Sequence, residues 1–324
     1  MILILKQAIE KMKINRLIRI VYFTENGKKV AKRLKESFLD YLFEEKDDNT
    51  DLLDFVGEAF KYHLPMVFVG ATGIAVRTIA PFVSDKLSDS PVIVIDELGL
   101  NVIPILSGHF GMANDLAKEF SKGLDANCVI TTATDINNVF SVDSFAVKEG
   151  YRIVDKNQIK VISSKALMKE KIAVETKEDG VYFDDRLMLI PKELVIGMGC
   201  KKDKDFSDLL DFLLEDYSEK ELRDNLYAIC SIDVKAKEKG LLKLAAYLGA
   251  KFITFSAEEL NDCKGQFEES DFVKAKVGVG NVSERAVACL GATILKSKEA
   301  RDGMTKAIGK RSVGTVEWQE KFSL

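Results

Sequence analysis

The feature that most constrains this fold is a repeated alternation of short apolar, β-branched runs with longer segments whose apolar residues recur at helical spacing. Near the start of the chain, the runs LIRIVYF, MVFVG, VIVID, VIPIL and CVITT predict strands at residues 17–23, 66–70, 92–96, 102–106 and 128–132. A turn at 25–27 and helices near 28–43, 73–82 and after residue 109 lie between these strands. The link at 97–101 is short enough for a hairpin. This order is typical of an α/β protein with a mainly parallel sheet.

The alternation stops at residue 135 and returns near residue 193. Between them the segments are shorter and more polar. The second series has strands at ELVIGMGC, LYAICSI and KFITF, with helices near residues 205–215 and 238–248 and from residue 283. We therefore expect an α/β fold of two Rossmann-like, mainly parallel modules, residues 1–134 and 192–324, joined by a smaller mixed α/β linker domain, residues 135–191. The residues from Glu317 are expected to form a short tail.

The charge balance argues against a nucleic-acid partner. The chain has 47 Lys and Arg residues against 51 Asp and Glu residues, a net charge of −4. No long block of one sign is present, so general nucleic-acid binding is not favoured. No segment has the roughly 18 uncharged apolar residues that a membrane-spanning helix requires. We therefore expect neither nucleic acid nor membrane as a partner.

The cysteines and the first residues both favour a cytoplasmic protein. Five cysteines, Cys128, Cys200, Cys230, Cys263 and Cys289, are odd in number and widely spaced, and none forms a C-x-x-C pair. This pattern suits reduced thiols and does not suggest a zinc site or a redox switch. Charged residues interrupt the apolar start MILILKQAIEKMK, and no small-residue cleavage site follows it, so it is not a convincing export signal.

Glycine-bearing turns recur at three predicted strand ends. They are VGATGIAVRTIAPF at residues 69–82, VIGMGCKKD at 195–203 and VGVGNVSERA at 277–286. Glycine lets a ligand approach the backbone, and the amides that open the next helix favour an anion. None completes G-x-G-x-x-G, so a nucleotide site is only weakly supported. Ordinary tight turns with helix caps explain each turn taken alone equally well.

Basic residues stand beside two of these turns. Arg77 follows the first, and Lys201 and Lys202 lie in the second. Any one of them alone is more simply a solvated surface charge. Together they stand at strand ends, where open α/β sheets bind their ligands. This placement favours contacts with carboxylates of a ligand.

The stretch VIPILSGHFGMANDLAKEF places one of only two histidines at a strand-to-helix turn. Neutral imidazole is the main form of an unperturbed histidine at pH 7, so His109 is suited to take a proton from water. Helix capping or a polar niche is the structural alternative. Ser107 lacks the G-x-S-x-G context of a hydrolase nucleophile, and Asp115 need not share a helix face with His109. The second histidine, His63, is expected to be structural.

These residues carry a resemblance to a known family. The block from GATGIAVRTIAPF through SGHFGMANDLAKEF to VITTATD resembles the N-terminal module of the cobalamin-biosynthesis family CbiG, the cobalt-precorrin-5A hydrolases. VIGMGCKKD, KAKEKGLLKLAAYLG, VGVGNVSERAV and TKAIGKR are similar to its C-terminal module. The resemblance implies opening of a δ-lactone on an anionic cobalt-tetrapyrrole, with release of acetaldehyde. It implies no organic cofactor, because the cobalt arrives inside the substrate, and no protein metal site.

The resemblance and the motifs together assign candidate roles. His109 is the predicted base, with Asp115 or Glu97 as its orienting carboxylate; axial ligation of the substrate's cobalt is an alternative role for His109. The predicted substrate-binding residues are Gly70, Gly73, Arg77, Ser107, Gly108, Asn114, Gly197, Gly199, Cys200, Lys201, Lys202, Gly278, Gly280, Ser283 and Glu284. We expect the two modules to hold the macrocycle between their glycine turns. A non-catalytic tetrapyrrole carrier, a homodimer and transient contact with neighbouring pathway enzymes stay open.

Overall fold

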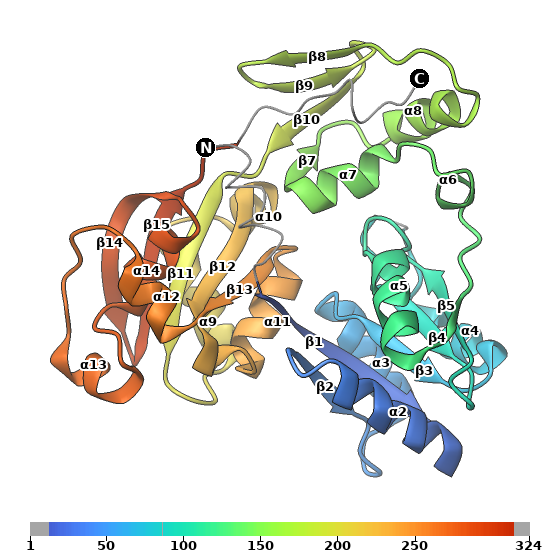
Figure 1. The fold of residues 1–324 in the computed structure, drawn as a ribbon, viewed down its shortest axis with the longest axis horizontal. Helices are drawn as coiled ribbons and strands as arrows, with labels where there is room; N and C mark the ends of the chain where they lie inside the picture. The colour runs from blue at the N-terminus through green and yellow to red at the C-terminus, as the bar shows by residue number, and fades with distance from the viewer. Residues whose placement is uncertain (1–12, 86, 314–324) are drawn as a thin grey trace. The chain divides into compact units, whose positions relative to one another are not determined.

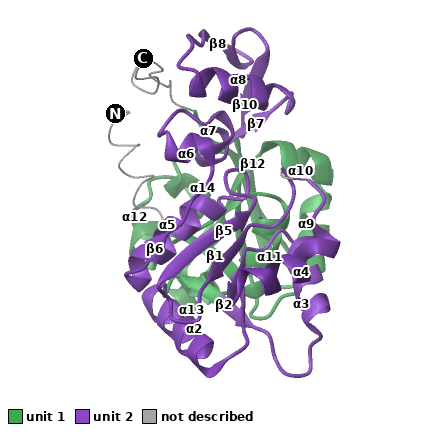
Figure 2. Cartoon of the chain, turned by 90° about the vertical axis from the view of Figure 1, so that its right-hand side faces the viewer, with its two compact units in different colours: residues 1–17, 39–42, 193–314 green, residues 18–38, 43–192, 315–324 purple. Residues whose placement is uncertain are grey.

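The computed structural model describes residues 13–85 and 87–313 and divides the chain into two compact units. Unit 1 comprises residues 1–17, 39–42 and 193–314, and unit 2 comprises residues 18–38, 43–192 and 315–324 (Figure 2). The described strands form an 11-stranded sheet and a separate four-stranded antiparallel sheet. The expected α/β class is confirmed as a mixed α/β fold (Figure 1).

Strand β1 (Lys13–Tyr22) contributes to both units. Its first residues pair antiparallel with β13 (Lys251–Phe255) in unit 1, and Arg19 to Tyr22 pair parallel with β3 (Met66–Val69) in unit 2. The apolar run that predicted this strand is almost entirely buried. The polar residues before it, which carried no strand signal, are paired as well.

Unit 2 begins with a parallel ladder of β1, β3 and β4 (Val92–Ile95). The ladder then reverses direction, because β5 (Asn101–Leu106) runs antiparallel to β4, and β6 (Asn127–Cys128) runs parallel to β5. The predicted hairpin between residues 92 and 106 is therefore confirmed. The helices of this first half of unit 2 are α2 (Glu25–Ser37), α3 (Leu52–Lys61), α4 (Thr72–Ile79) and α5 (Ala113–Leu124), with the 3-10 turn η1 (Ala80–Phe82).

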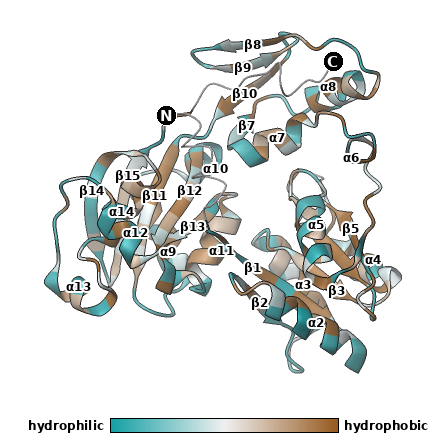
Figure 3. Ribbon diagram, in the orientation of Figure 1, coloured by the Kyte–Doolittle hydropathy of each residue, from teal (hydrophilic) through white to brown (hydrophobic). Residues whose placement is uncertain are grey.

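Three local predictions for this part of the chain are wrong. Residues 25–27 are not a turn but open α2, because the Thr24 side chain accepts a hydrogen bond from Gly27 N at 3.0 Å and caps the helix there. The helix ends at Ser37, and strand β2 (Tyr41–Glu45) occupies the residues expected to be its last turn. Of the run CVITT, only Cys128 lies in a strand, the two-residue β6 that it forms with Asn127. Helix α2 is mostly teal in Figure 3, the colour of hydrophilic residues, whereas strand β11 (Leu194–Cys200) is mostly hydrophobic.

The second half of unit 2 consists of short elements. Strands β7 (Tyr151–Ile153), β10 (Leu187–Pro191), β9 (Gly180–Phe183) and β8 (Val174–Lys177) pair in that order, all antiparallel. Helices α6 (Ala133–Ile136), α7 (Val142–Glu149) and α8 (Gln158–Leu167) accompany them. Phe140 stacks on Phe183 with ring centroids 5.9 Å apart, so aromatic packing joins this sheet to the segment before α7.

Unit 1 contains the parallel ladder of β11 (Leu194–Cys200), β12 (Leu226–Ile232) and β13. The hairpin of β14 (Thr293–Arg301) and β15 (Met304–Lys310) joins β11 antiparallel. The helices of unit 1 are α9 (Phe206–Leu214), α10 (Glu219–Asn225), α11 (Lys239–Tyr247), α12 (Ala257–Asp262), α13 (Asp271–Val277) and α14 (Val282–Cys289), with the 3-10 turn η2 (Asp233–Lys235). The predicted strands and the predicted helices of this region are confirmed.

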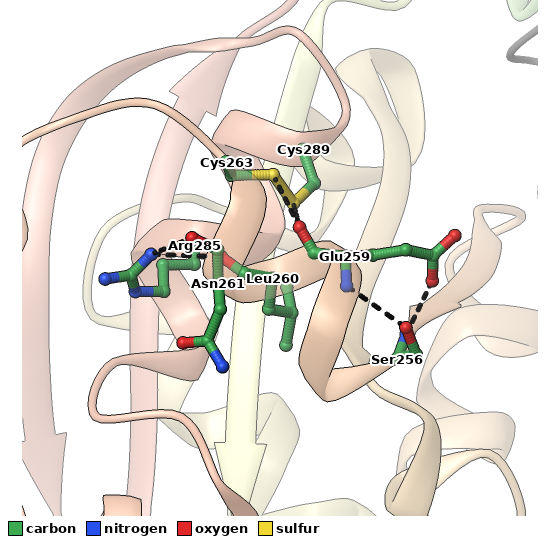
Figure 4. The surroundings of a disulfide bond; sticks show 7 residues. All are labelled: Ser256, Glu259, Leu260, Asn261, Cys263, Arg285 and Cys289. Atoms are coloured by element: carbon green, nitrogen blue, oxygen red, sulfur yellow. Dashed lines mark hydrogen bonds between the residues drawn. A yellow bond between two sulfur atoms is a disulfide. The ribbon is translucent and has the colours of Figure 1, made fainter.

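The expectation of five reduced thiols is wrong for two cysteines. Cys263 and Cys289 form a disulfide, with their Cα atoms 5.5 Å apart, and it links the residue after α12 to the last residue of α14 (Figure 4). They lie 26 residues apart in the sequence, and only the packing of α12 against α14 brings them together. Cys128, Cys200 and Cys230 are free.

In the described part of the chain, no helix is long and apolar enough to span a membrane. The tail predicted from Glu317 and the residues before Lys13 fall outside the described residues.

Candidate active site

The loop between β5 and α5 places His109. Two backbone bonds fold the loop directly into the helix: Ala113 N donates to Ser107 O at 3.2 Å, and Asn114 N donates to Gly108 O at 3.0 Å. Residue 108 must be small, since a Cβ atom there would lie 2.7 Å from the Asn114 side-chain oxygen. The glycine thereby leaves Asn114 free to reach across to α6.

His109 is held between two carboxylates from different helices. Its Nε2 lies 2.7 Å from Asp135 Oδ2 in α6, and its Nδ1 lies 3.3 Å from Asp143 Oδ2 in α7. Asp135 also accepts hydrogen bonds from Asn114 Nδ2 at 2.9 Å and from Lys118 Nζ at 2.8 Å. Each side of the imidazole ring therefore faces a fixed acceptor.

The surrounding hydrogen bonds determine the protonation of the ring. Ser141 Oγ lies 3.3 Å from His109 Nδ1, but its single proton is donated to Asp143 Oδ1 at 2.5 Å. No donor then remains for a lone pair on Nδ1. On the other side of the ring, the Thr134 hydroxyl lies 3.3 Å from Nε2. An imidazolium satisfies both carboxylate contacts.

The pKa shifts agree with this arrangement. Burial of His109 acts to lower its pKa, but the hydrogen bonds and charges of Asp143 and Asp135 outweigh it, so the pKa is raised. Burial acts to raise the pKa of Asp143 and of Asp135. Hydrogen bonds from His109 and Ser141 to the first, and from Lys118 and His109 to the second, outweigh burial and lower both.

A cavity of about 280 Å³ opens beside this cluster. His109, which is 14% exposed, lines it together with Asp135 and Ser141. Two lysines and two phenylalanines add cationic and apolar wall: Lys118, Lys148, Phe140 and Phe145. Asp143 is not among the lining residues and contacts His109 through Nδ1. Such a pocket suits a ligand with an apolar body and acidic groups.

The predicted orienting carboxylates do not contact His109. Asp115 pairs with Lys148 at 2.9 Å. Glu97 accepts a hydrogen bond from Thr24 at 3.0 Å, before the start of β5. His109 follows the other end of this six-residue strand, about 20 Å away at the usual rise per residue. In the structure Asp135 and Asp143, in place of Asp115 or Glu97, are the carboxylates that contact His109.

Gly70, Gly73 and Arg77 lie at the opposite edge of the unit 2 sheet from His109. Val69 pairs with Ile95, which in turn pairs with Val102. Leu106, four residues after Val102 along β5, pairs with Val92 at the other end of β4. The reversed direction of β5 therefore separates the Gly70 turn from the Ser107 turn by at least about 13 Å. The two turns therefore lie at opposite ends of the β4–β5 hairpin.

Two other predicted residues flank His109 in the chain. Ser107 is buried and donates its hydroxyl to Asp89 O at 2.7 Å, which gives it a structural role in the turn. Asn114 reaches Asp135 and also lies 3.2 Å from Thr132 Oγ1. Of the predicted binding residues near His109, Asn114 is thus the one whose side chain reaches the cluster.

The glycine turns of unit 1 are closely packed. A Cβ at Gly197 would lie 1.8 Å from the backbone oxygen of Ser283, so the strand and helix α14 touch at this point. Asn281 caps α14 by accepting from Glu284 N at 3.1 Å. The Glu284 carboxylate accepts from Asn281 Nδ2 at 2.8 Å and from Lys298 N at 2.7 Å. These contacts match the alternative of tight turns with helix caps.

The remaining predicted residues of unit 1 have similar local roles. Gly278, with φ of +78°, ends α13, and a Cβ at Gly280 would meet the Glu269 carboxylate. Gly199 lies on β11, and burial raises the pKa of the neighbouring Cys200 thiol to about 11. The remaining two are cationic: Lys201 pairs through its backbone with Gly303, and Lys202 is exposed.

No cluster of three or more His, Cys, Asp or Glu side chains within residues 13–85 and 87–313 is placed to hold a metal ion.

Two family models match the chain. Cobalamin synthesis G N-terminal matches residues 54–135, and Cobalamin synthesis G C-terminus matches residues 194–309. The chain belongs to the CbiG family. The resemblance seen in the sequence is therefore confirmed.

Similar proteins extend over almost the whole chain. A cobalt-precorrin-5A hydrolase of Salmonella typhimurium is 33% identical over 90% of this chain and 97% of its own length. A cobalt-precorrin-5A hydrolase of Priestia megaterium is 28% identical over 88% of this chain and 92% of its own length. A crystal structure of a cobalamin biosynthesis protein G homolog from Sulfolobus solfataricus has a TM-score of 0.41 and 22% identity, covering 93% of this chain and 99% of its own.

Sequence reasoning on this CbiG family member found His109 but missed both of its carboxylate partners. Asp135 ends the stretch VITTATD, which belongs to the block that carried the family resemblance. That position was an available signal. Asp143 follows Ser141 at the start of α7 and looks like an ordinary acidic residue of a first helical turn, so nothing local marked it.

Proposed function

We propose that this chain is a cobalt-precorrin-5A hydrolase of cobalamin biosynthesis. It opens the δ-lactone of a cobalt-containing tetrapyrrole and releases a two-carbon fragment as acetaldehyde, which leaves cobalt-precorrin-5B. The observation that carries this proposal is the 33% identity to the Salmonella enzyme over 97% of that enzyme's length. Because the sequence similarity extends over nearly the full length of that enzyme, it supports the same complete activity for this chain.

The His109 pocket is the proposed centre of the chemistry. Opening a lactone needs a proton acceptor for the attacking water and a proton donor for the departing oxygen. His109 and Asp135 supply one of each in a single cavity. Because His109 bonds two carboxylates, we assign it proton donation in place of the base role that its residue type alone suggested.

Binding of an anionic macrocycle is supported by the composition of the pocket wall. Phe140 and Phe145 offer apolar surface for the ring system, and Lys118 and Lys148 offer positive charge for acetate and propionate arms. The predicted contacts of Gly70, Gly73, Arg77 and the unit 1 glycine turns stay predictions, as does a macrocycle held between two modules.

The finer domain interpretation also belongs to this proposal. Two Rossmann-like modules joined by a linker domain at 135–191 are supported by the family-model matches, which end at 135 and resume at 194.

Two alternatives are separable from the hydrolase. A carrier would bind the tetrapyrrole without converting it, and the glycine turns alone would suit that role. An axial cobalt ligand at residue 109 would need a deprotonated ring nitrogen, whereas both nitrogens of His109 face carboxylates. That geometry favours proton transfer over ligation.

The deciding assay incubates the protein with cobalt-precorrin-5A and measures acetaldehyde by its reduction with alcohol dehydrogenase. Stoichiometric acetaldehyde is expected from the unaltered protein, and a loss of about 100-fold or more is expected for His109→Gln. A protein that binds the substrate and returns it unchanged would be a carrier.

A further inference from the structure

The two carboxylates around His109 differ in where they lie. Asp135 lines the cavity and approaches Nε2 at 2.7 Å, the shorter of the two contacts. Asp143 lies outside the lining residues, and its Oδ1 accepts from Ser141 Oγ and from Ser144 N at 3.0 Å. One carboxylate can therefore meet a ligand, and the other can act only through the imidazole.

We propose that His109 Nε2 and Asp135 form the proton-exchanging pair of the lactone-opening step, and that Asp143 is a positioning residue that fixes Nδ1–H. This inference rests on the proposed function and adds to it the return of the proton from Asp135 to Nε2 and the positioning role of Asp143. It follows from the placement of the two carboxylates relative to the cavity.

The proton balance of the step is complete without an added co-reactant. Water attacks the lactone carbonyl, and Asp135 takes one of its protons. The bond between the carbonyl carbon and the ring oxygen breaks, and the electron pair goes to that oxygen, which receives the Nε2 proton of His109. Asp135 then returns its proton to Nε2 across 2.7 Å. The second water proton leaves with the new carboxyl group, which ionises into solvent.

The coupling between the two groups explains why one contact can serve both transfers. While Asp135 is ionised, it holds the Nε2 proton. Once it is protonated by water, its attraction for the imidazolium falls, and the Nε2 proton becomes available to the departing oxygen. Asp143 keeps its negative charge on the Nδ1 side throughout, which holds the ring in place.

Other charged groups face the same cavity and enter the pH dependence. Lys118 of α5 pairs with Asp135 at 2.8 Å. Lys148 and Glu149 of α7 line the cavity, and Lys148 pairs with Asp115 of α5. The two lysines favour ionised Asp135, and the acidic residues favour protonated His109.

The first experiment uses the substrate-free protein and does not depend on activity. Nuclear magnetic resonance of ¹⁵N-labelled imidazoles follows the titration of both histidines, and His63→Gln identifies the signals, since the chain has only two. We expect a His109 midpoint above the ordinary value of about 6.5 and a lower midpoint in Asp143→Asn. The matched control is Glu36→Gln, which changes an exposed carboxylate of α2 and leaves the midpoint unchanged.

The second experiment measures acetaldehyde release from cobalt-precorrin-5A across pH. Asp135→Asn is expected to lower kcat by about 100-fold or more, because the pair loses its acceptor. Asp143→Asn is expected to lower kcat with little change in KM, and to move the high-pH limb of the profile to lower pH. Glu36→Gln keeps the profile of the unaltered protein.

The outcomes separate this inference from the proposed function. Acetaldehyde release with a His109 midpoint at or below 6.5, or with unchanged kcat in Asp135→Asn, would overturn the proton pair and leave the hydrolase intact. An Asp143→Asn variant that changes KM alone would overturn the positioning role. Absence of acetaldehyde with the unaltered protein would overturn both proposals, even if the midpoints shift as expected.

Discussion

Each unit of this protein places a basic side chain among carboxylates, and the two sites are built differently. In unit 2, His109 lies between Asp135 and Asp143 and lines a cavity. In unit 1, Lys306 is 1% exposed, donates to Phe212 O at 2.6 Å and pairs with Asp216 at 2.5 Å. Its ammonium group also lies 4.1 Å from the centre of the Phe212 ring.

The two sites show how a charged group that stabilises the fold can be distinguished from one that can take part in a reaction. Both cations have enough partners to offset the cost of leaving water. The Lys306 partners join β15 to the end of α9. His109 and Asp135 line a cavity, and imidazole can gain or lose a proton near neutral pH. Burial and pairing alone do not mark a functional group; access and a suitable pKa do.

The strongest test of this comparison replaces the basic residue of each site in turn. Lys306→Met is expected to lower the free energy of unfolding by about 3–5 kcal/mol, because it leaves partly buried carboxylates without their shared cation. His109→Gln is expected to lower it by only about 1–3 kcal/mol, the value of hydrogen bonds to charged groups, while it removes most acetaldehyde release. Urea unfolding and the acetaldehyde assay measure the two effects. Equal stability losses, or an active His109→Gln, would erase the distinction.

The disulfide provides a second test, confined to unit 1. Cys289→Ser removes a bond that closes a loop across a sequence separation of 26, and it is expected to lower the free energy of unfolding by about 3 kcal/mol. The His109 midpoint should stay unchanged, because its carboxylate partners, Asp135 and Asp143, belong to unit 2. Unfolding is measured with and without a reductant. If reduction leaves the stability of the unaltered protein unchanged, the bond does not stabilise unit 1.

Two glycines of β11 provide a third test, with smaller expected changes in the free energy of unfolding. Gly197→Ala is expected to cost about 1–3 kcal/mol, because the new methyl group would meet the backbone of Ser283, which cannot rotate away. Gly199→Ala is the matched control on the same strand, where the nearest atom is the mobile Thr305 hydroxyl, and it should cost less. Unfolding free energies of the two variants decide the point. A harmless Gly197→Ala would mean that α14 and β11 are not closely packed.

The fold could be predicted where strands are short apolar runs. Runs such as MVFVG and VIVID carried the parallel ladder of unit 2, because a strand buried on both faces is apolar throughout. The strand Tyr41–Glu45 was missed, since its residues are only half-buried and its sequence continues a helix pattern. The hairpin of β4 and β5 was predicted, and its reversed strand places the Gly70 turn and the Ser107 turn at opposite ends of the sheet.

The candidate site was predicted only in part. His109 was visible as a rare residue type at a turn, but its partners lie 26 and 34 residues further along the chain, and only the packing of α6 and α7 brings them to the ring. The same limit applies to Gly197, whose close neighbour Ser283 is far away in the sequence. Spacing reports local geometry, and these contacts depend on tertiary structure.

The smallest expected effect is the pH dependence of stability, and its sign follows from the pKa shift of His109. Because folding raises that pKa, the stabilisation is fully present below about 6.5 and is lost as pH rises through the folded-state value. The lowered pKa values of Asp135 and Asp143 act oppositely: their stabilisation is present above about 3.8 and is lost only on acidification. Of these three groups, only the imidazole changes its contribution between pH 6 and pH 9.

The destabilisation by His109→Gln should accordingly be about 1 kcal/mol larger at pH 6 than at pH 9, the difference between hydrogen bonds with a charged and with a neutral donor. Urea unfolding of both proteins at the two pH values measures it. Lys306→Met, measured at the same two pH values, is the reference. A His109→Gln effect that does not depend on pH would make the two buried cations alike, and the imidazole a structural tie.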